Sequence, residues 1–82
     1  KKVFIKDSAI ASIANGAPLY PNGITKIQKE IERGETVAIL SLKNELVALG
    51  ISKMTSEEMF ERKKGIAVRT DRVFIERSVY PA

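Results

Sequence analysis

The sequence contains no cysteine and no histidine, and it also lacks tryptophan. Without cysteine there is no disulfide, no thiolate metal ligand and no thiol nucleophile, a composition that fits a reducing compartment or a hot one. Without histidine the chain lacks the commonest general base and the commonest zinc ligand. These absences argue against an autonomous enzyme, and we expect no catalytic residue, no metal site and no cofactor in this chain.

Long hydrophobic runs are also missing. No apolar stretch approaches the ~20 residues that a membrane-spanning helix needs, and no signal-peptide core follows the first residues. We therefore expect no membrane association and a cytoplasmic location. The 82 residues suit one domain, 1–82. Because the chain begins with Lys1 rather than Met, we expect it to be a C-terminal fragment of a longer protein.

The charge balance gives the first positive indication of a partner. Fourteen Lys and Arg against ten Asp and Glu leave a net charge of +4, and the sequence pI is about 9.6. A basic surplus suits an anionic partner such as nucleic acid. It equally suits an ordinary soluble surface, so charge alone leaves both interpretations open.

The N-terminal part of the chain predicts a strand followed by a helix. Residues 3–5 are apolar between lysines, and Asp7 occupies the expected N-cap position. Helical spacing then predicts a buried stripe at Ile10, Ile13, Ala14 and Ala17, and Gly16 should end the helix in a left-handed conformation. The opposite face carries only short polar side chains: Ser8, Ser12 and Asn15. Another molecule could approach this face closely, or its small residues could line a tight internal contact.

A loop and an ambiguous run come next. Residues 16–24 read GAPLYPNGI, in which Pro21-Asn22-Gly23 is strong turn chemistry. In 24–34 the isoleucines have helical spacing, and Thr25 with Gln28 could form a capping box. The β-branched residues at its start also permit a strand that ends in a helical turn.

The second half of the chain predicts more strand than helix. Residues 36–42 and 46–53 form a β-hairpin around the turn 43–45. Thr55 and Glu58 form a capping box for a helix that continues to about Lys63 and is closed by Gly65. Two extended runs, 66–70 and 72–76, follow around Asp71. The fold class is therefore mainly β (α+β), with five to six short strands and two short helices, packed as a curled, barrel-like sheet whose ends the helices plug.

Several segments together resemble the PUA domain, an RNA-binding module. The matching segments are Lys6-Asp7-Ser8-Ala9-Ile10, Asn15-Gly16-Ala17-Pro18-Leu19, Gly23-Ile24, Arg33-Gly34-Glu35-Thr36-Val37-Ala38 and Leu46-Val47-Ala48-Leu49-Gly50. The later segments Ser56-Glu57-Glu58-Met59, Lys64-Gly65-Ile66-Ala67-Val68 and Tyr80-Pro81 are similar to the archaeal dyskerin-like, guide-RNA-dependent pseudouridine synthases. The chain departs from their usual pattern at Asn15, where His is common, at Pro18, where Asp is usual, and at Val79, where Trp is frequent.

The resemblance implies a PUA-like pseudobarrel whose RNA-binding edge is the first helix with the loop after it. In the dyskerin-like enzymes this edge holds the lower stem and 3′ ACA end of a guide RNA, and in relatives it holds the acceptor end of tRNA. The resemblance also implies a strand at 23–27, followed by a short helical turn that ends at Gly34. We therefore expect RNA, of H/ACA-type guide or tRNA origin, as the partner.

The predicted binding residues follow from what RNA recognition needs. Gly16 and Gly23 allow close approach, Leu19 and Pro21 offer apolar contact, and Tyr20 could stack a base. Lys26 could pair with phosphate. Tyr20 could instead be a half-buried aromatic and Lys26 a solvated lysine. The full predicted set is Ser12, Asn15, Gly16, Ala17, Pro18, Leu19, Tyr20, Gly23, Ile24, Lys26, Arg69, Arg72 and Tyr80.

The other cations have simpler interpretations. Arg69 and Arg72 could reach RNA, although shielding of an edge strand is slightly favoured. Lys63 and Lys64 suit the C-terminus of a helix through its dipole.

The leading hypothesis is an RNA-anchoring module of a pseudouridine synthase whose catalytic domain lies outside this chain. A first alternative is a protein-interaction module of a ribonucleoprotein, which would contact other subunits through the full-length protein. A second is the PUA domain of another archaeal tRNA-modifying enzyme, such as a tRNA-guanine transglycosylase.

Overall fold

A computed structural model describes residues 1–75 and contains a five-stranded sheet in the order β2-β1-β3-β4-β5. The predicted contribution of Tyr80 lies outside the described residues. The elements along the chain are β1 (Lys2–Ile5), α1 (Asp7–Ala14), the 3₁₀ turn η1 (Pro21–Gly23), β2 (Ile24–Ile27), β3 (Thr36–Leu40), β4 (Leu46–Ser52), α2 (Ser56–Glu61) and β5 (Val68–Val73).

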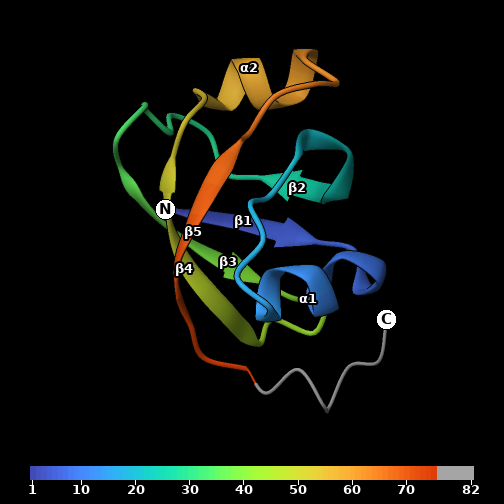
Figure 1. Cartoon of the computed structure of the whole chain (residues 1–82). Helices are drawn as coiled ribbons and strands as arrows, with labels where there is room; N and C mark the ends of the chain where they lie inside the picture. The colour runs from blue at the N-terminus through green and yellow to red at the C-terminus, as the bar shows by residue number, and fades with distance from the viewer. Residues whose placement is uncertain (76–82) are drawn as a thin grey trace.

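The sheet is mixed and curled, as expected. β1 pairs in parallel with β3, and the other neighbours pair antiparallel. Three register shifts leave one extra residue each in β2, β4 and β5, and such bulges bend a strand and increase its twist. In Figure 1, α2 lies at one end of the curled sheet and α1 lies toward the other. The predicted class, mainly β with two short helices, is confirmed.

Gly50 lets β4 and β5 approach closely. A Cβ atom at this position would lie 2.5 Å from Val68 Cγ1 and 2.7 Å from the carbonyl oxygen of Arg69. No real side chain fits in such a space, so the residue must be glycine for β5 to keep its register. The register shift opposite Leu49 and Gly50, in which β5 has an extra residue, lies at the same place, and the tight contact and the bend therefore occur together.

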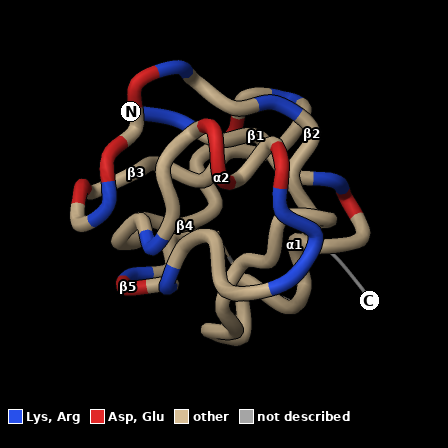
Figure 2. Tube along the Cα trace, turned by 90° about the horizontal axis from the view of Figure 1, so that it is seen from above, with Lys and Arg blue, Asp and Glu red and all other residues tan. Residues whose placement is uncertain are grey.

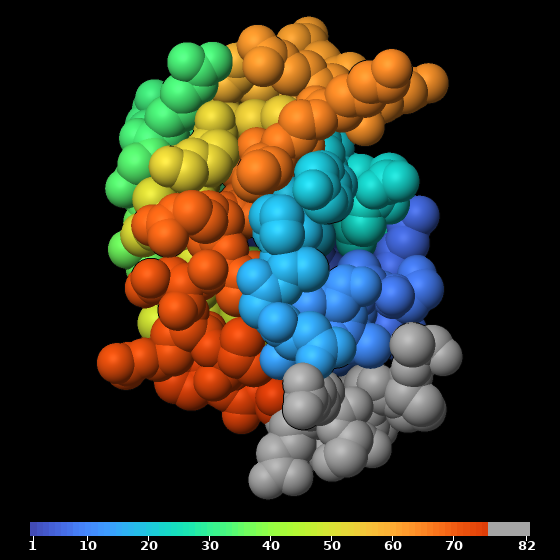
Figure 3. Space-filling view, viewed as in Figure 1, coloured from blue at the N-terminus to red at the C-terminus, as the bar shows by residue number. Residues whose placement is uncertain are grey.

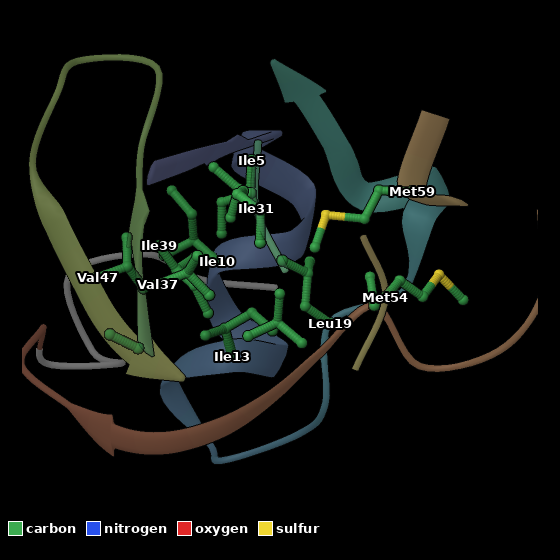
Figure 4. Packing of buried hydrophobic residues seen from close by; sticks show 14 residues of the cluster. Ile5, Ile10, Ile13, Leu19, Ile31, Val37, Ile39, Val47, Met54 and Met59 are labelled. Atoms are coloured by element: carbon green, nitrogen blue, oxygen red, sulfur yellow. The ribbon is translucent and has the colours of Figure 1, made fainter. Parts of the chain in front are cut away.

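The core is mostly isoleucine and valine from every element of the barrel. Figure 4 shows side chains from the strands, α1 and the loop after it pointing toward one another. Ile5, Ile10, Ile31, Ile39 and Val47 are fully buried. Burial of one such side chain stabilises the fold by about 1.5–3 kcal/mol, which makes these contacts the main stabilising term.

α1 begins and ends as local chemistry dictates, with one correction at its start. Lys6, not Asp7, is the N-cap, and it makes no side-chain cap hydrogen bond; Asp7 lies in the first turn, where a carboxylate suits the helix dipole. At the other end, Gly16 takes a φ of +89°. Its N–H donates to the Ile13 carbonyl and that of Ala17 to the Ser12 carbonyl, which is the Schellman pattern.

The buried face of α1 differs slightly from the predicted stripe. Ile10 and Ile13 are buried as expected. Ala11, which was not part of the predicted stripe, is also buried, whereas Ala14 and Ala17 are only partly buried. Ser8, Ser12 and Asn15 are exposed.

Residues 28–35 correct another prediction. The strand β2 is confirmed, but the helical turn expected to end at Gly34 is absent from the described residues, which form successive turns here. Glu30 has a φ of +64°, which no right-handed helix permits. Thr25 does not cap a helix, because its hydroxyl donates to the Phe4 carbonyl at 3.2 Å. Tertiary contacts therefore overrode the helical spacing of the isoleucines.

The hairpin of β3 and β4 and the Thr55–Glu58 capping box are confirmed. α2 ends at Glu61, two residues earlier than expected. The two runs predicted around Asp71 are one strand, β5, in which a register shift falls between the partners of Leu49 and Gly50 and leaves Asp71 as the extra residue. Of the helices described in residues 1–75, none is long and apolar enough to cross a membrane.

Candidate nucleic-acid interface

A groove of about 280 Å³ lies between α1 and the loop that follows it. We call it the α1 groove. Its lining combines one cation, three exposed polar side chains and one phenol ring with small and apolar residues. The lining residues are Lys6, Ser8, Ala9, Ser12, Ile13, Pro18, Leu19, Tyr20, Asn22 and Gly23. The structure thus brings together five of the predicted residues: Ser12, Pro18, Leu19, Tyr20 and Gly23.

The loop that forms one wall of this groove is fixed by backbone pairing with β5. Leu19 donates its N–H to the Val68 carbonyl and accepts from the Ala67 N–H, both at 2.8 Å. The Thr70 hydroxyl donates to the Ala17 carbonyl at 2.7 Å. Figure 3 shows the loop lying between α1 and β5. Because these bonds are made within the chain, they fix the wall of the groove, and a fixed wall lowers the entropic cost of binding.

Tyr20 and the polar face of α1 provide the chemistry of the groove. The Tyr20 side chain is 48% exposed, so much of its ring is free to stack on an unstacked base. Ser8 and Ser12 are exposed on the facing helix and can exchange hydrogen bonds with ribose or base edges. Lys6 supplies a positive charge for phosphate. The arrangement suits a nucleotide that stands apart from a stack.

Two of the residues predicted to offer apolar contact have buried side chains. Leu19 is 1% exposed and packs in the core, and Pro21 is buried too. Leu19 contributes to the floor of the groove but offers little surface to a ligand. Gly23 also serves packing, since a Cβ there would lie 3.3 Å from the Ala9 Cβ. The periodicity of the sequence could not reveal this, because the loop has none.

Asn15, Gly16 and Ala17 lie at the end of α1 and do not line the groove. The Asn15 side-chain amide donates to the Ala11 carbonyl at 2.9 Å, and the N–H groups of Gly16 and Ala17 are used by the helix end. Their contribution is to shape the loop. The sequence analysis placed Ser8 on the approachable face of the helix but not among the binding residues, and it missed Lys6 and Asn22. The position of Lys6 directly before a predicted helix was the available signal.

The other predicted residues lie elsewhere. Ile24 and Lys26 line a second, larger groove of about 1210 Å³ between β2 and α2, which we call the β2–α2 groove. Lys26 Nζ lies 5.5 Å from the centroid of the Phe4 ring, a cation–π distance. The two grooves share Lys6 and Asn22.

Arg69 and Arg72 are exposed on β5, the opposite edge of the sheet, and line neither groove.

Comparison with known proteins identifies the fold. The family model of the PUA domain matches residues 1–74. The chain belongs to the PUA domain family. Among the residues 1–75 of this PUA domain, no three acidic side chains gather closely enough to hold a metal ion.

The curated relatives of this PUA domain are archaeal. Over 80 residues it is 55% identical to the probable tRNA pseudouridine synthase B of Pyrococcus horikoshii. The matched region covers 98% of this chain and 24% of that protein. Its identity to the probable tRNA pseudouridine synthase B of Nanoarchaeum equitans is 51% over 81 residues, covering 99% of the chain and 23% of that protein. The chain therefore spans about a quarter of the length of these relatives.

Solved structures show the same likeness. A chain in the structure of an H/ACA ribonucleoprotein bound to a substrate RNA containing 2′-deoxyuridine matches with a TM-score of 0.96 and 55% identity, covering 98% of this chain and 25% of that one. A chain of the archaeal box H/ACA Nop10–Cbf5 complex matches with a TM-score of 0.96 and 52% identity, covering 99% and 26%. At these identities the likeness extends beyond the fold to most of the sequence.

Proposed function

We propose that this PUA domain anchors a structured RNA for an archaeal pseudouridine synthase whose catalytic domain lies outside residues 1–82. The likeness to tRNA pseudouridine synthase B and to chains of H/ACA ribonucleoproteins supports this parent. In this proposal the domain positions RNA and carries none of the catalytic residues.

The observation that carries the proposal is the α1 groove. It places the exposed ring of Tyr20 opposite the short polar side chains of α1, with Lys6 beside them. Single-stranded RNA ends are recognised by stacking planes, close polar groups and cations in this kind of arrangement. The groove is small, so it suits one or two nucleotides rather than a duplex.

The RNA we favour is a guide RNA, bound through its lower stem and 3′ ACA end. A matching chain belongs to an H/ACA ribonucleoprotein with bound substrate RNA, whereas the curated relatives are probable tRNA pseudouridine synthases. The acceptor end of tRNA is therefore the second candidate. For the full-length protein we propose ribonucleoprotein partners, since another matching chain belongs to a Cbf5–Nop10–Gar1 complex.

The experiment compares RNA hairpins that differ only at the 3′ end. The 82-residue chain is titrated with a hairpin ending in ACA, the same hairpin with a scrambled end, and a tRNA acceptor-stem mimic, and binding is followed by fluorescence anisotropy. Preference for the ACA end supports the guide RNA. Preference for the acceptor mimic moves the function to tRNA, and equal weak binding of all three contradicts an end-specific site.

The salt dependence measures the phosphate contacts. For about four phosphates, log affinity should fall against log salt with a slope of roughly −3 to −4. A slope near zero would mean that phosphate contacts do not hold the RNA.

A further inference from the structure

The β2–α2 groove runs along the edge of a strand. All four residues of β2, Ile24–Ile27, line it. Successive side chains of a strand point to opposite faces of the sheet. A groove that touches all four must therefore follow the edge of β2, rather than lie over one face.

This edge of β2 is unpaired among residues 1–75, because β2 is the outermost strand of the sheet and pairs only with β1. The Gln28 N–H donates to the Lys2 carbonyl at 3.1 Å. Hydrogen-bonded positions alternate along an antiparallel strand, so the backbone groups of Ile27 point away from β1. They face the groove and are available to another strand. Thr25 is the extra residue of the register shift in β2, so this alternation stops at Lys26.

α2 keeps this edge open while forming the opposite wall. Ser56 Oγ donates to the Gln28 carbonyl and accepts from the Ile31 N–H, both at 2.8 Å. These bonds attach α2 to the chain just beyond the end of β2. The helix is thereby held beside the strand without pairing with it.

The lining has an aliphatic floor and a cationic rim. Ile24 and Ile27 are partly buried, and Phe60 at the rim is 86% exposed. The charged lining residues are five cations and two acids: Lys6, Lys26, Lys29, Arg62, Lys63, Glu30 and Glu57. Figure 2 shows basic segments along β2 and just after α2 on the same side of the molecule. An acidic partner with apolar side chains fits this surface.

We propose that the β2–α2 groove binds an extended segment of a partner protein, which adds a strand to β2. The segment alternates acidic and aliphatic side chains: its backbone pairs with the outward N–H and C=O of Ile27, its carboxylates meet the lysines, and its aliphatic groups meet the floor and Phe60. Strand addition to an open edge is a recurring mode of peptide recognition. This is a second binding activity, separate from the RNA site in the α1 groove.

Two other occupants fit the surface less well. An open strand edge matches the N–H and C=O groups of an extended polypeptide, which RNA does not have. A second copy of the domain would place Lys26 and Lys29 of one edge against those of the other. Like charges on paired strands are destabilising, so self-pairing through β2 is disfavoured.

The test uses a blocked eight-residue peptide of alternating Glu and Val, titrated into the 82-residue chain. Backbone amide NMR should show the largest chemical-shift changes at Thr25, Ile27 and Phe60, residues of this groove alone, together with slower hydrogen exchange of the Ile27 amide. A Lys/Val peptide of equal length should bind at least roughly tenfold more weakly, since it meets the same rim with like charge.

Variants separate strand pairing from simple charge attraction. Methylation of alternate peptide nitrogens removes the N–H groups that would pair with β2, and the Glu/Val peptide should then bind roughly three- to tenfold more weakly. This change leaves the protein itself unaltered. Lys26→Glu should weaken binding, and Lys43→Glu, in the hairpin turn outside both grooves, should not.

Three results would overturn the proposal. The first is equal affinity for the Glu/Val and Lys/Val peptides, or peptide-induced chemical-shift changes that are confined to the α1 groove. The second is displacement of the peptide by an ACA-ended hairpin that itself shifts Thr25 and Ile27, which would assign the groove to RNA. The third is concentration-dependent broadening of β2 signals without peptide, which would assign it to a second copy. Failure of the peptide to bind would not contradict the RNA site, because RNA binding there is detected by chemical-shift changes at Tyr20 and Ser12.

Discussion

Tyr20 is the residue on which RNA recognition by the α1 groove most depends. Nearly half of its side chain is exposed, and the loop beneath it is held by backbone bonds to β5. Tyr20→Ala should therefore reduce RNA affinity by about 1–3 kcal/mol with little change in stability, because the ring contributes to stacking more than to the core. Anisotropy titration with the ACA-ended hairpin measures the loss.

Tyr20→Phe is the matched control for this substitution. It keeps the aromatic plane and removes only the hydroxyl, so most of the affinity should remain. If the Ala variant binds as tightly as the unaltered chain while its amide spectrum shows a native fold, Tyr20 does not stack a base.

At the scale of elements, Ser56 joins α2 to the segment that follows β2. Its side chain is nearly buried and bonds both the Ile31 N–H and the Gln28 carbonyl. Ser56→Ala leaves the N–H of Ile31 without this partner, and we expect a loss of about 1–3 kcal/mol in unfolding free energy. Urea denaturation measures it. Ser12→Ala, on the exposed face of α1, is the control and should change stability by less than about 0.5 kcal/mol.

Glu58 makes the stability of α2 depend on pH. Its carboxylate accepts from the Arg33 guanidinium and from the Thr55 N–H, and Arg62 pairs with it at 2.8 Å. The pKa of Glu58 is lowered from 4.5 to about 2, chiefly by the hydrogen bond from Arg33 and secondly by the hydrogen bond from the Thr55 N–H. The folded-state pKa lies below that of the unfolded chain, so this contribution is complete above about pH 4.5 and is lost as the pH falls toward 2.

Glu58→Gln tests this pH dependence. The amide still accepts hydrogen bonds but does not titrate, so the variant should be less stable than the unaltered chain at pH 7 and should lose less stability between pH 5 and about pH 2. Thermal unfolding across that range provides the comparison. Parallel pH profiles of the two proteins would show that another carboxylate controls acid stability. Glu57→Gln, in the same turn but exposed, serves as the control.

At the scale of the whole molecule, the loop after α1 closes the barrel through Leu19. Its backbone pairs with Val68 and its side chain is 1% exposed in the core. Leu19→Ala should cost about 2–5 kcal/mol of unfolding free energy, since it leaves a cavity where several elements meet. Leu42→Ala is the matched control, because Leu42 is 58% exposed. Similar unfolding midpoints in urea for both variants would contradict a central role for Leu19.

Local chemistry explains why much of the fold is predictable. The glycine after α1, the Thr55–Glu58 capping box and the β3–β4 hairpin each depend on residues a few positions apart, and the structure confirms all three. The PUA resemblance and the mainly β class are also confirmed. The prediction of a helical turn before Gly34 was wrong, because Ser56 forms hydrogen bonds with Gln28 and Ile31 that hold this segment in another conformation. These bonds join residues at least 25 positions apart, so the local pattern could not reveal them.

The sequence by itself determined the helix of α1, the β3–β4 hairpin, the capping box of α2 and the family, and it indicated Tyr20 and the short polar face of α1 as candidates for binding. Only the tertiary structure decided that Leu19 belongs to the core, that Lys26 and Arg69 do not line the α1 groove, and that the edge of β2 is open. The reason is the range of the interactions. Capping and turns act between near neighbours, whereas grooves depend on contacts such as that between Thr70 and Ala17, 53 positions apart.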